Sequence, residues 1–312
     1  MPVFQIHHVT KYTYNRPVKE SVNQLRIYPV ASDQQEILQH DVNITSDPEM
    51  FFFLDHWGNR CADFSLMEAH KTLVVDSRVV VRTIAHDVVS DVASTVNDLL
   101  QYIEKDFQLL ELARPEEIQS ADAIQEILRS IDCNHKTVKQ IVEACSAYIF
   151  SGFKYIKGIT NIETTVDEIL EHRSGVCQDF AHVLLQLLRT MGIPSRYVSG
   201  YICPNKNGMR GEGATHAWVE AWIPQLGWIG IDPTNNVWAT THHVKLAVGR
   251  HFNDCSPVKG TFKGLARQTL SVYVSVGYED GQVFEELNDV QMIVTESALE
   301  AERQQAEEAA QQ

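Results

Sequence analysis

A cysteine at the start of an apolar helix is the first feature of this sequence that could do chemistry. Apolar residues recur at positions 181, 184, 185 and 188, which is the spacing of a helix with one buried face. Cys177 therefore lies in the first turn, where free backbone N–H groups and the helix dipole favour a thiolate. The same N–H groups could stabilise an oxyanion beside the sulfur. Cys177 is a candidate nucleophile, and the alternative is an ordinary buried cysteine.

A predicted hairpin downstream supplies a candidate base and a candidate carboxylate. Two segments, 214–223 and 227–232, are rich in aromatic and β-branched residues and are separated by a turn. His216 and Asp232 face the same side if opposed residue numbers have an even sum, as a three- or five-residue loop or a bulge would give. If Trp218 lies opposite Asp232, His216 is a diagonal neighbour within side-chain reach. Cysteine, histidine and carboxylate could then act as nucleophile, base and orienting residue.

These motifs resemble the transglutaminase-like superfamily of papain-like cysteine enzymes. The matching segments are Gly175–Ala181, Gly192–Tyr201, Thr215–Glu220 and Asp232–Thr234. The resemblance implies Cys177 as the nucleophile, His216 as general base and acid, and Asp232 as the residue that orients His216. It also implies an α+β fold in which a helix-borne cysteine packs on an antiparallel β-sheet.

The first part of the chain resembles the β domain that precedes this core in bacterial members of the superfamily. The matching segments are His7–Tyr14, Leu25–Pro29 and Asp55–Asn59. Short alternating segments at close spacing predict a sandwich or a barrel. Together the similarity extends to about residue 280, so we expect a β-rich N-terminal domain before the catalytic core.

Three further residues are candidates for an oxyanion site or for the cleft. In the family, an aromatic or amide side chain that precedes the nucleophile can complete the oxyanion hole, and Tyr155 is a candidate for this role. Its alternative role is that of a half-buried aromatic residue in a strand. Gln178 directly follows the nucleophile, and Trp218 shares the face of His216.

Composition restricts the partners that this protein could have. The chain has 312 residues, 44% of them hydrophobic, and a formal net charge of -15. This charge argues against nucleic acid and anionic membranes as partners, because their phosphates would be repelled. The first residues lack the cationic start and apolar run of a signal peptide, and no segment has the length of a membrane span.

The cysteines and a pair of histidines give no indication of a metal site. The six cysteines have no zinc-site or disulfide-framework spacing, so we expect reduced thiols in a cytoplasmic protein. His242 and His243 are adjacent and lack further ligand spacing, which favours a surface turn. The sequence predicts no cofactor and no metal, and it does not predict the oligomeric state.

The pattern of strands and helices predicts four regions. Strand-like alternation changes to helical periodicity from about residue 93. The expected regions are a β-rich N-terminal domain (1–85), a helical connector (86–135), a transglutaminase-like catalytic core (136–295) and an acidic tail (296–312), helical or disordered.

The predicted activity is that of a protease or amidase acting on a protein or peptide substrate. The thiol would attack a carboxamide or peptide carbonyl and form a thioester, which water resolves. One alternative is a transglutaminase, in which an amine resolves the same thioester. Another is a catalytically silent scaffold that binds peptides in the cleft.

Overall fold

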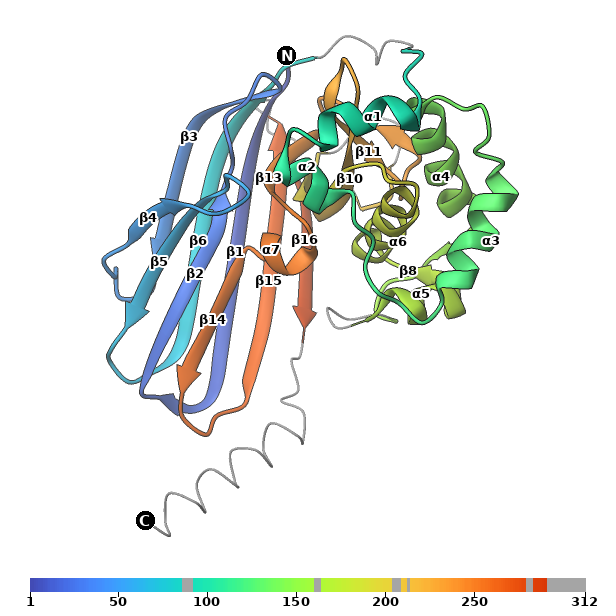
Figure 1. Ribbon diagram of the computed structural model, residues 1–312. Coiled ribbons are helices and arrows are strands. Elements are labelled where there is room, and N and C mark those ends of the chain that lie inside the picture. The colour runs from blue at the N-terminus through green and yellow to red at the C-terminus, as the bar shows by residue number, and fades with distance from the viewer. Residues whose placement is uncertain (86–91, 160–163, 204–208, 212–213, 279–282, 291–312) are drawn as a thin grey trace.

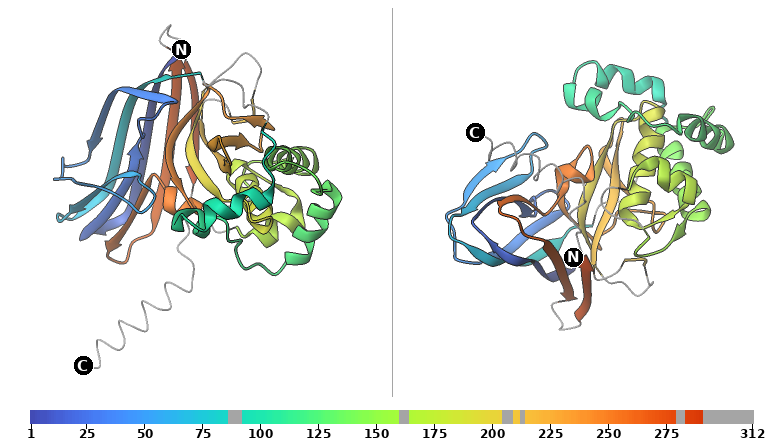
Figure 2. Two further views of the ribbon diagram at one scale, coloured as in Figure 1. Left: turned by 45° about the horizontal axis from the view of Figure 1, so that its top comes forward. Right: turned by 90° about the horizontal axis from the view of Figure 1, so that it is seen from below.

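The computed structural model describes residues 1–85, 92–159, 164–203, 209–211, 214–278 and 283–290. This part of the chain forms a β-sandwich lobe and a core lobe that carries the helices (Figure 1). The two views in Figure 2 show the helices of residues 121–190 (α3, α4, α5 and α6) on the side of the core lobe that faces away from the sandwich, whereas the short α7 (Phe252–Cys255) lies next to the sandwich. The structure is therefore of the mixed α+β class, with a β-rich N-terminal region, as predicted from the sequence.

The β-sandwich lobe contains two antiparallel sheets. A five-stranded sheet has the order β16-β15-β1-β6-β3, and a four-stranded sheet has the order β14-β2-β5-β4. Their bounds are β1 Val3–Val18, β2 Glu20–Tyr28, β3 Gln35–Ile44, β4 Phe51–Leu54, β5 Arg60–Leu66, β6 His70–Thr83, β14 Val258–Lys263, β15 Gln268–Tyr278 and β16 Val283–Val290.

The core lobe contains the remaining elements. Its main sheet has the order β12-β11-β10-β9-β13, and two short strands, β7 and β8, form a parallel pair. Its helices are α1 Val96–Ile103, α2 Phe107–Leu112, α3 Ala121–Ile131, α4 Val138–Gly152, α5 Val166–His172, α6 Cys177–Thr190 and α7 Phe252–Cys255. Its strands are β7 Lys154–Tyr155, β8 Ser174–Gly175, β9 Ser195–Ile202, β10 Ala214–Ile223, β11 Gly227–Asp232, β12 Val237–Trp238 and β13 His243–Gly249. No helix in the described ranges is long and apolar enough to cross a membrane.

Helix α6 is buried on all sides, whereas its sequence pattern predicts one buried face. Its apolar side packs against α4, α5 and the face of β10 that carries Ala217 and Val219. The polar residues on its other side are also buried, because they bond to backbone groups of the surrounding chain. Gln186 bonds to the backbone of Glu116, and Arg189 donates to the carbonyls of Ser195 and Arg250. A central helix thus holds Cys177 in a fixed position.

The long strand β1 packs against both lobes with a single face. Its alternation buries the even-numbered residues from Phe4 to Tyr14. Tyr12 and Tyr14 contribute to the core between the two sheets of the sandwich. Phe4 and Ile6 instead pack against Tyr201 and its neighbours in the core lobe. One strand therefore connects the interior of the sandwich to the interface between the lobes.

The C-terminal strands lie in the sandwich, which differs from the predicted ranges of the domains. β14 pairs with β2, and β15 pairs along β1 from Phe4↔Tyr278 to Tyr14↔Gln268. In Figure 1 the orange β14 and β15 accordingly lie beside the blue N-terminal strands. The range 136–295 therefore contains strands of both lobes, because the chain returns to complete the first two sheets. The predicted tail, 296–312, lies outside the described residues.

The motif around Asn59 fastens the sandwich to the core sheet. The Asn59 side chain is buried, donates to the Val248 carbonyl at 2.7 Å and accepts the Val248 N–H at 2.8 Å. Asp55 holds this turn, because it accepts the Asn59 N–H and the Arg26 guanidinium. The segments Leu25–Pro29 and Asp55–Asn59, which resemble the bacterial N-terminal domain, are therefore bonded to each other at the junction of the lobes.

We expect Asn59→Ala to lower the free energy of unfolding by about 1–3 kcal/mol, because two buried backbone groups of Val248 lose their partner. Urea unfolding measures this change. Asn43→Ala on β3 is the matched control, since Asn43 is exposed. An equal midpoint shift in the two variants would contradict the role assigned to Asn59.

Candidate active site

Cys177 is the first residue of α6, as the sequence predicts. The turn before it is fixed by Asp179, whose carboxylate accepts the Val176 N–H at 2.7 Å. Gly175 is required here, because a Cβ at this position would lie 2.5 Å from the Asp179 carboxylate. Cys177 is half-buried, and all six cysteines lie in the described ranges as free thiols. Its sulfur therefore lies at a helix N-terminus and remains accessible.

The predicted hairpin brings His216 to Asp232. The pairs Val219↔Ile231 and Ile223↔Gly227 give opposed residue numbers an even sum across a three-residue loop, which is one of the expected registers. β11 ends at Asp232, where Pro233 cannot continue the ladder. His216 Nε2 lies 2.9 Å from Asp232 Oδ2, and neither side chain is exposed.

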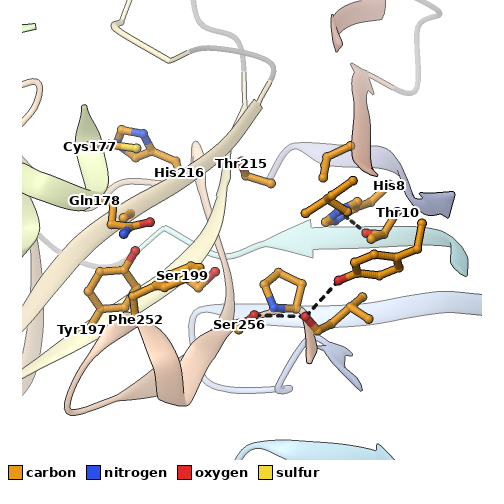
Figure 3. Close-up of a pocket in the computed structure, with 16 residues that line it drawn as sticks. His8, Thr10, Cys177, Gln178, Tyr197, Ser199, Thr215, His216, Phe252 and Ser256 are labelled. Atoms are coloured by element: carbon orange, nitrogen blue, oxygen red, sulfur yellow. Dashed lines mark hydrogen bonds between the residues drawn. The ribbon is translucent and has the colours of Figure 1, made fainter. Parts of the chain in front are cut away.

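The remaining nitrogen of His216 is directed to the cysteine. Nδ1 is buried and is not used by Asp232, and Figure 3 shows the Cys177 sulfur beside the His216 ring. Gly211 lies close to this edge of the ring, since a Cβ on it would be 3.1 Å from Nδ1. Its φ of +82° also favours glycine at this position. The order sulfur, imidazole, carboxylate is thus that of a nucleophile, a base and an orienting group.

Four donors surround the carboxylate of Asp232. Oδ2 accepts from His216, from Asn235 Nδ2 at 2.7 Å and from His243 Nε2 at 3.4 Å. Oδ1 accepts the Thr234 N–H at 2.8 Å. The carboxylate is completely buried, so these bonds replace its lost hydration.

His243 corrects the prediction of a surface turn, since its side chain is 1% exposed. Its tautomer follows from its partners: the Thr240 N–H donates to Nδ1 at 3.1 Å, so the ring proton is on Nε2 and points to Asp232. Burial lowers the pKa of His243, which keeps it neutral. The adjacent histidine pattern gave no indication of this role, because the contact depends on long-range pairing of β13 with β9.

The same three side chains form a group that could hold a metal ion. Ligand atoms of His216, Asp232 and His243 lie within 4.8 Å of one another. Each atom is already used in a hydrogen bond, and His243 Nε2 carries a proton rather than a free lone pair. The donor set therefore fits a hydrogen-bonded carboxylate better than a metal centre.

The electrostatics favour a charged imidazole. Burial disfavours the imidazolium, but the opposing charges of Asp232 and Cys177 and their hydrogen bonds raise the pKa of His216 to about 10. Burial likewise disfavours the Asp232 carboxylate, yet the charge and hydrogen bond of His216 hold its pKa well below the ordinary range. At neutral pH the pair is an imidazolium bonded to a carboxylate.

Cys177 and His216 open into a pocket of about 250 Å³ between the lobes (Figure 3). Gln178, one of the predicted cleft residues, lines this pocket. Tyr197 also lines it and was not predicted from the sequence. Its phenol stays protonated and can donate, because burial and the nearby Cys177 raise the pKa of Tyr197.

The other two predicted cleft residues lie elsewhere. Trp218 is 1% exposed and packs with Val198 and Val248, so it belongs to a small core rather than to the cleft. Gly200 makes room for its ring, since a Cβ there would lie 2.6 Å from it. Tyr155 is half-buried in β7, edge-on to Phe180, and is not among the described residues that line the pocket.

Comparisons with known proteins identify both regions of the chain. Residues 125–233 match the model of the transglutaminase-like superfamily, and residues 4–82 match the bacterial transglutaminase-like N-terminal region. An uncharacterized protein of Mycobacterium leprae is 33% identical over 276 residues, which is 87% of this chain and 97% of the relative.

A solved structure has the same fold over most of its length. It is the crystal structure of a candidate cysteine protease from Cytophaga hutchinsonii, with a TM-score of 0.68 at 22% identity, covering 94% of this chain and 92% of the other. A protein-glutamine gamma-glutamyltransferase of Pseudomonas aeruginosa is 37% identical over 83 residues, which is 25% of this chain and 12% of the relative.

We expect the His216 ring to stay protonated through neutral pH and to lose its proton only as the pH approaches about 10. In Asp232→Asn the midpoint should fall, because the main charge that favours the imidazolium is gone. Nitrogen-15 NMR titration measures both, with His216→Gln to assign the resonance. A wild-type midpoint near 6.5, unchanged in Asp232→Asn, would disprove this electrostatic description.

Replacing His243 by Phe should slow the reaction of Cys177 with iodoacetamide at pH 7 by about tenfold, since Asp232 loses a donor that fixes its orientation and that of His216. Mass spectrometry of the labelled protein follows the rate. His242→Phe is the control, because it makes the same change at the neighbouring residue, which is not bonded to Asp232. Equal rates in the two variants would count against a positioning role for His243.

Proposed function

The chain belongs to the transglutaminase-like superfamily, and we propose that it is a cysteine hydrolase that cleaves carboxamide or peptide bonds through a thioester. The observation that carries the proposal is the arrangement of three side chains. His216 is bonded to a buried carboxylate through Nε2 and presents Nδ1 to the thiol of Cys177. This is the geometry required of a base that serves a nucleophile.

The first half of the reaction forms the acyl-enzyme. The Cys177 sulfur attacks the carbonyl carbon, and a C–S bond forms as the carbonyl electrons move onto oxygen. N–H groups in the first turn of α6 are available to this oxyanion, and the Tyr197 phenol lies in the same pocket. The C–N bond then breaks, and the His216 imidazolium gives its proton to the departing amine.

The second half releases the acid and restores the thiol. Neutral His216 takes a proton from water as the water oxygen attacks the thioester carbon, and the C–S bond breaks to return the sulfur. Asp232 keeps the imidazole oriented in both halves, because its position is fixed by Thr234 and Asn235. Partial exposure of Cys177 supports water as the acceptor.

Amide transfer to an amine is the second candidate. The 83-residue match to a protein-glutamine gamma-glutamyltransferase supports it, because that segment of similarity is 37% identical. The same cysteine and histidine would serve both reactions, and the acceptor decides the product. A protein or peptide is the proposed acyl donor in either case.

The first test is iodoacetamide labelling of the native protein between pH 5 and 9, mapped by mass spectrometry. We expect Cys177 to react faster than Cys133 below pH 8 and to lose this advantage in His216→Ala. Cys133 is the internal control, since both thiols are half-buried. Comparable labelling of the two cysteines, unaffected by His216→Ala, would leave a peptide-binding scaffold as the better description.

The acceptor is tested with glutamine-containing peptides, with and without a primary amine. Hydrolysis gives the free acid and ammonia, while transfer gives an amide that carries the added amine. Either product should disappear in Cys177→Ala. Formation of the transfer product in preference to the acid would overturn the assignment as a hydrolase and favour a transglutaminase.

A further inference from the structure

The pocket at Cys177 lies beside one face of β9. At the start of the strand this face packs in the core that contains α6, and at its end it packs against the sandwich lobe. Tyr197, near the start of β9, packs in the core that contains α6. Tyr201, four residues on and on the same face, packs against β1 and β15 of the sandwich. Ser199 lies between them and lines the pocket. The space beside the thiol therefore exists because the N-terminus of α6 and the sandwich cover the same strand without meeting.

One wall of the pocket belongs to the sandwich lobe. Thr10 and Tyr12 of β1 lie opposite Val272 and Leu270 of β15, so all four share one face of the sheet. Val258, at the start of β14, also lines the pocket, and its carbonyl accepts the hydroxyl of Tyr12. Apart from Thr10 and the imidazole of His8, this wall presents hydrocarbon and an aromatic ring.

The lining carries little charge. Among the described residues that line the pocket there is no carboxylate, lysine or arginine. His8 is neutral at pH 7, because burial and the neighbouring His7 lower its pKa to about 4, and it bonds to Tyr201 and Thr10. Tyr12 is also neutral, since burial raises its pKa to about 12. The charged imidazole is therefore confined to the catalytic end.

Figure 3 shows how the two ends are arranged. Cys177 and His216 lie at one side, His8 and Thr10 of β1 lie at the other, and Thr215 and Ser256 lie between them. An acyl group held on the sulfur can thus extend from the core lobe to the sandwich. A charged group at the far end would lose its hydration without gaining a partner.

We propose that this pocket selects acyl donors that carry a large uncharged apolar group next to the attacked carbonyl. The proposal rests on the thioester chemistry above and adds the substrate class: peptides or amides with a long aliphatic or aromatic side chain at that position. The sandwich lobe supplies the wall that recognises this side chain. It is therefore a specificity element of the site as well as a support for the core.

The test uses four iodoacetamides: the parent compound, an N-hexyl derivative, and derivatives with chains of similar length that end in a carboxylate or an ammonium group. Each compound alkylates a thiol by forming an S–C bond with loss of iodide. The rate of each compound with Cys177 is divided by the rate of the same compound with free N-acetylcysteine, which removes differences in intrinsic reactivity. At Cys177 the hexyl compound should react at least about tenfold faster than the parent, equivalent to about 1.4 kcal/mol. The charged compounds should show no such gain.

Substitutions on β15 test whether the rate gain of the hexyl compound depends on the sandwich wall of the pocket. Leu270→Trp and Val272→Trp fill the pocket and should remove the gain of the hexyl compound over the parent compound, both rates being measured on the same variant. Thr269→Trp is the matched control, because Thr269 neighbours Leu270 on β15 but is exposed. Circular dichroism melting shows that each variant is folded, and the two pocket variants test the same wall independently.

The outcomes separate this proposal from the proposed function. Equal relative rates for all four compounds, or a gain that survives both pocket variants, would overturn the assignment of the substrate class while leaving an activated thiol intact. A parent rate that does not depend on His216 would instead contradict the hydrolase. If the hydrolase is contradicted in this way, the ratio of the hexyl rate to the parent rate still tests whether the pocket prefers an apolar group.

Discussion

A carboxylate removed from water must recover hydrogen bonds from the protein, and this constraint applies to Asp232, which is completely buried. Its four donors come from three separate segments of the chain. His216 is on β10, Thr234 and Asn235 follow β11, and His243 begins β13. A shift in the register of any of these strands would leave a buried charge without a partner, so a single carboxyl group links the hairpin to the far edge of the core sheet.

Local patterns were sufficient for much of the fold and for the three central residues. Helical spacing predicts Cys177 at the start of a helix. His216 and Asp232 lie on one side in an even-sum register, a condition that the sequence pattern sets and the observed three-residue loop meets. The failures concern packing between distant segments. His243 is buried through the pairing of β13 with β9, and Trp218 is enclosed because Gly200 leaves room for its ring. The sequence next to His243 does not indicate its pairing with β9, and the sequence next to Trp218 does not indicate its contact with Gly200.

The same limitation explains why the predicted ranges of the regions differ from the lobes. Periodicity identifies a strand but not its partner, so the segments around Val258 and Leu270 were assigned to the core. In the structure they complete the sheets that β1 and β2 begin. Helix α6 shows a related effect, since His182 and Arg189 read as polar but are buried by backbone partners supplied from elsewhere. Polarity in a sequence therefore does not by itself indicate exposure.

The pairing of β1 with β15 also affects the order in which the molecule can be assembled. Tyr12 is synthesised long before its partner Leu270, so β1 cannot complete its pairing until nearly all the described chain has left the ribosome. Contacts between residues so far apart in sequence are slow to form, and β1 has an unpaired edge in the meantime. The core lobe is translated between these two strands. The wall next to the thiol is consequently the last part of the cleft to form, which delays a complete site until both ends of the fold have met.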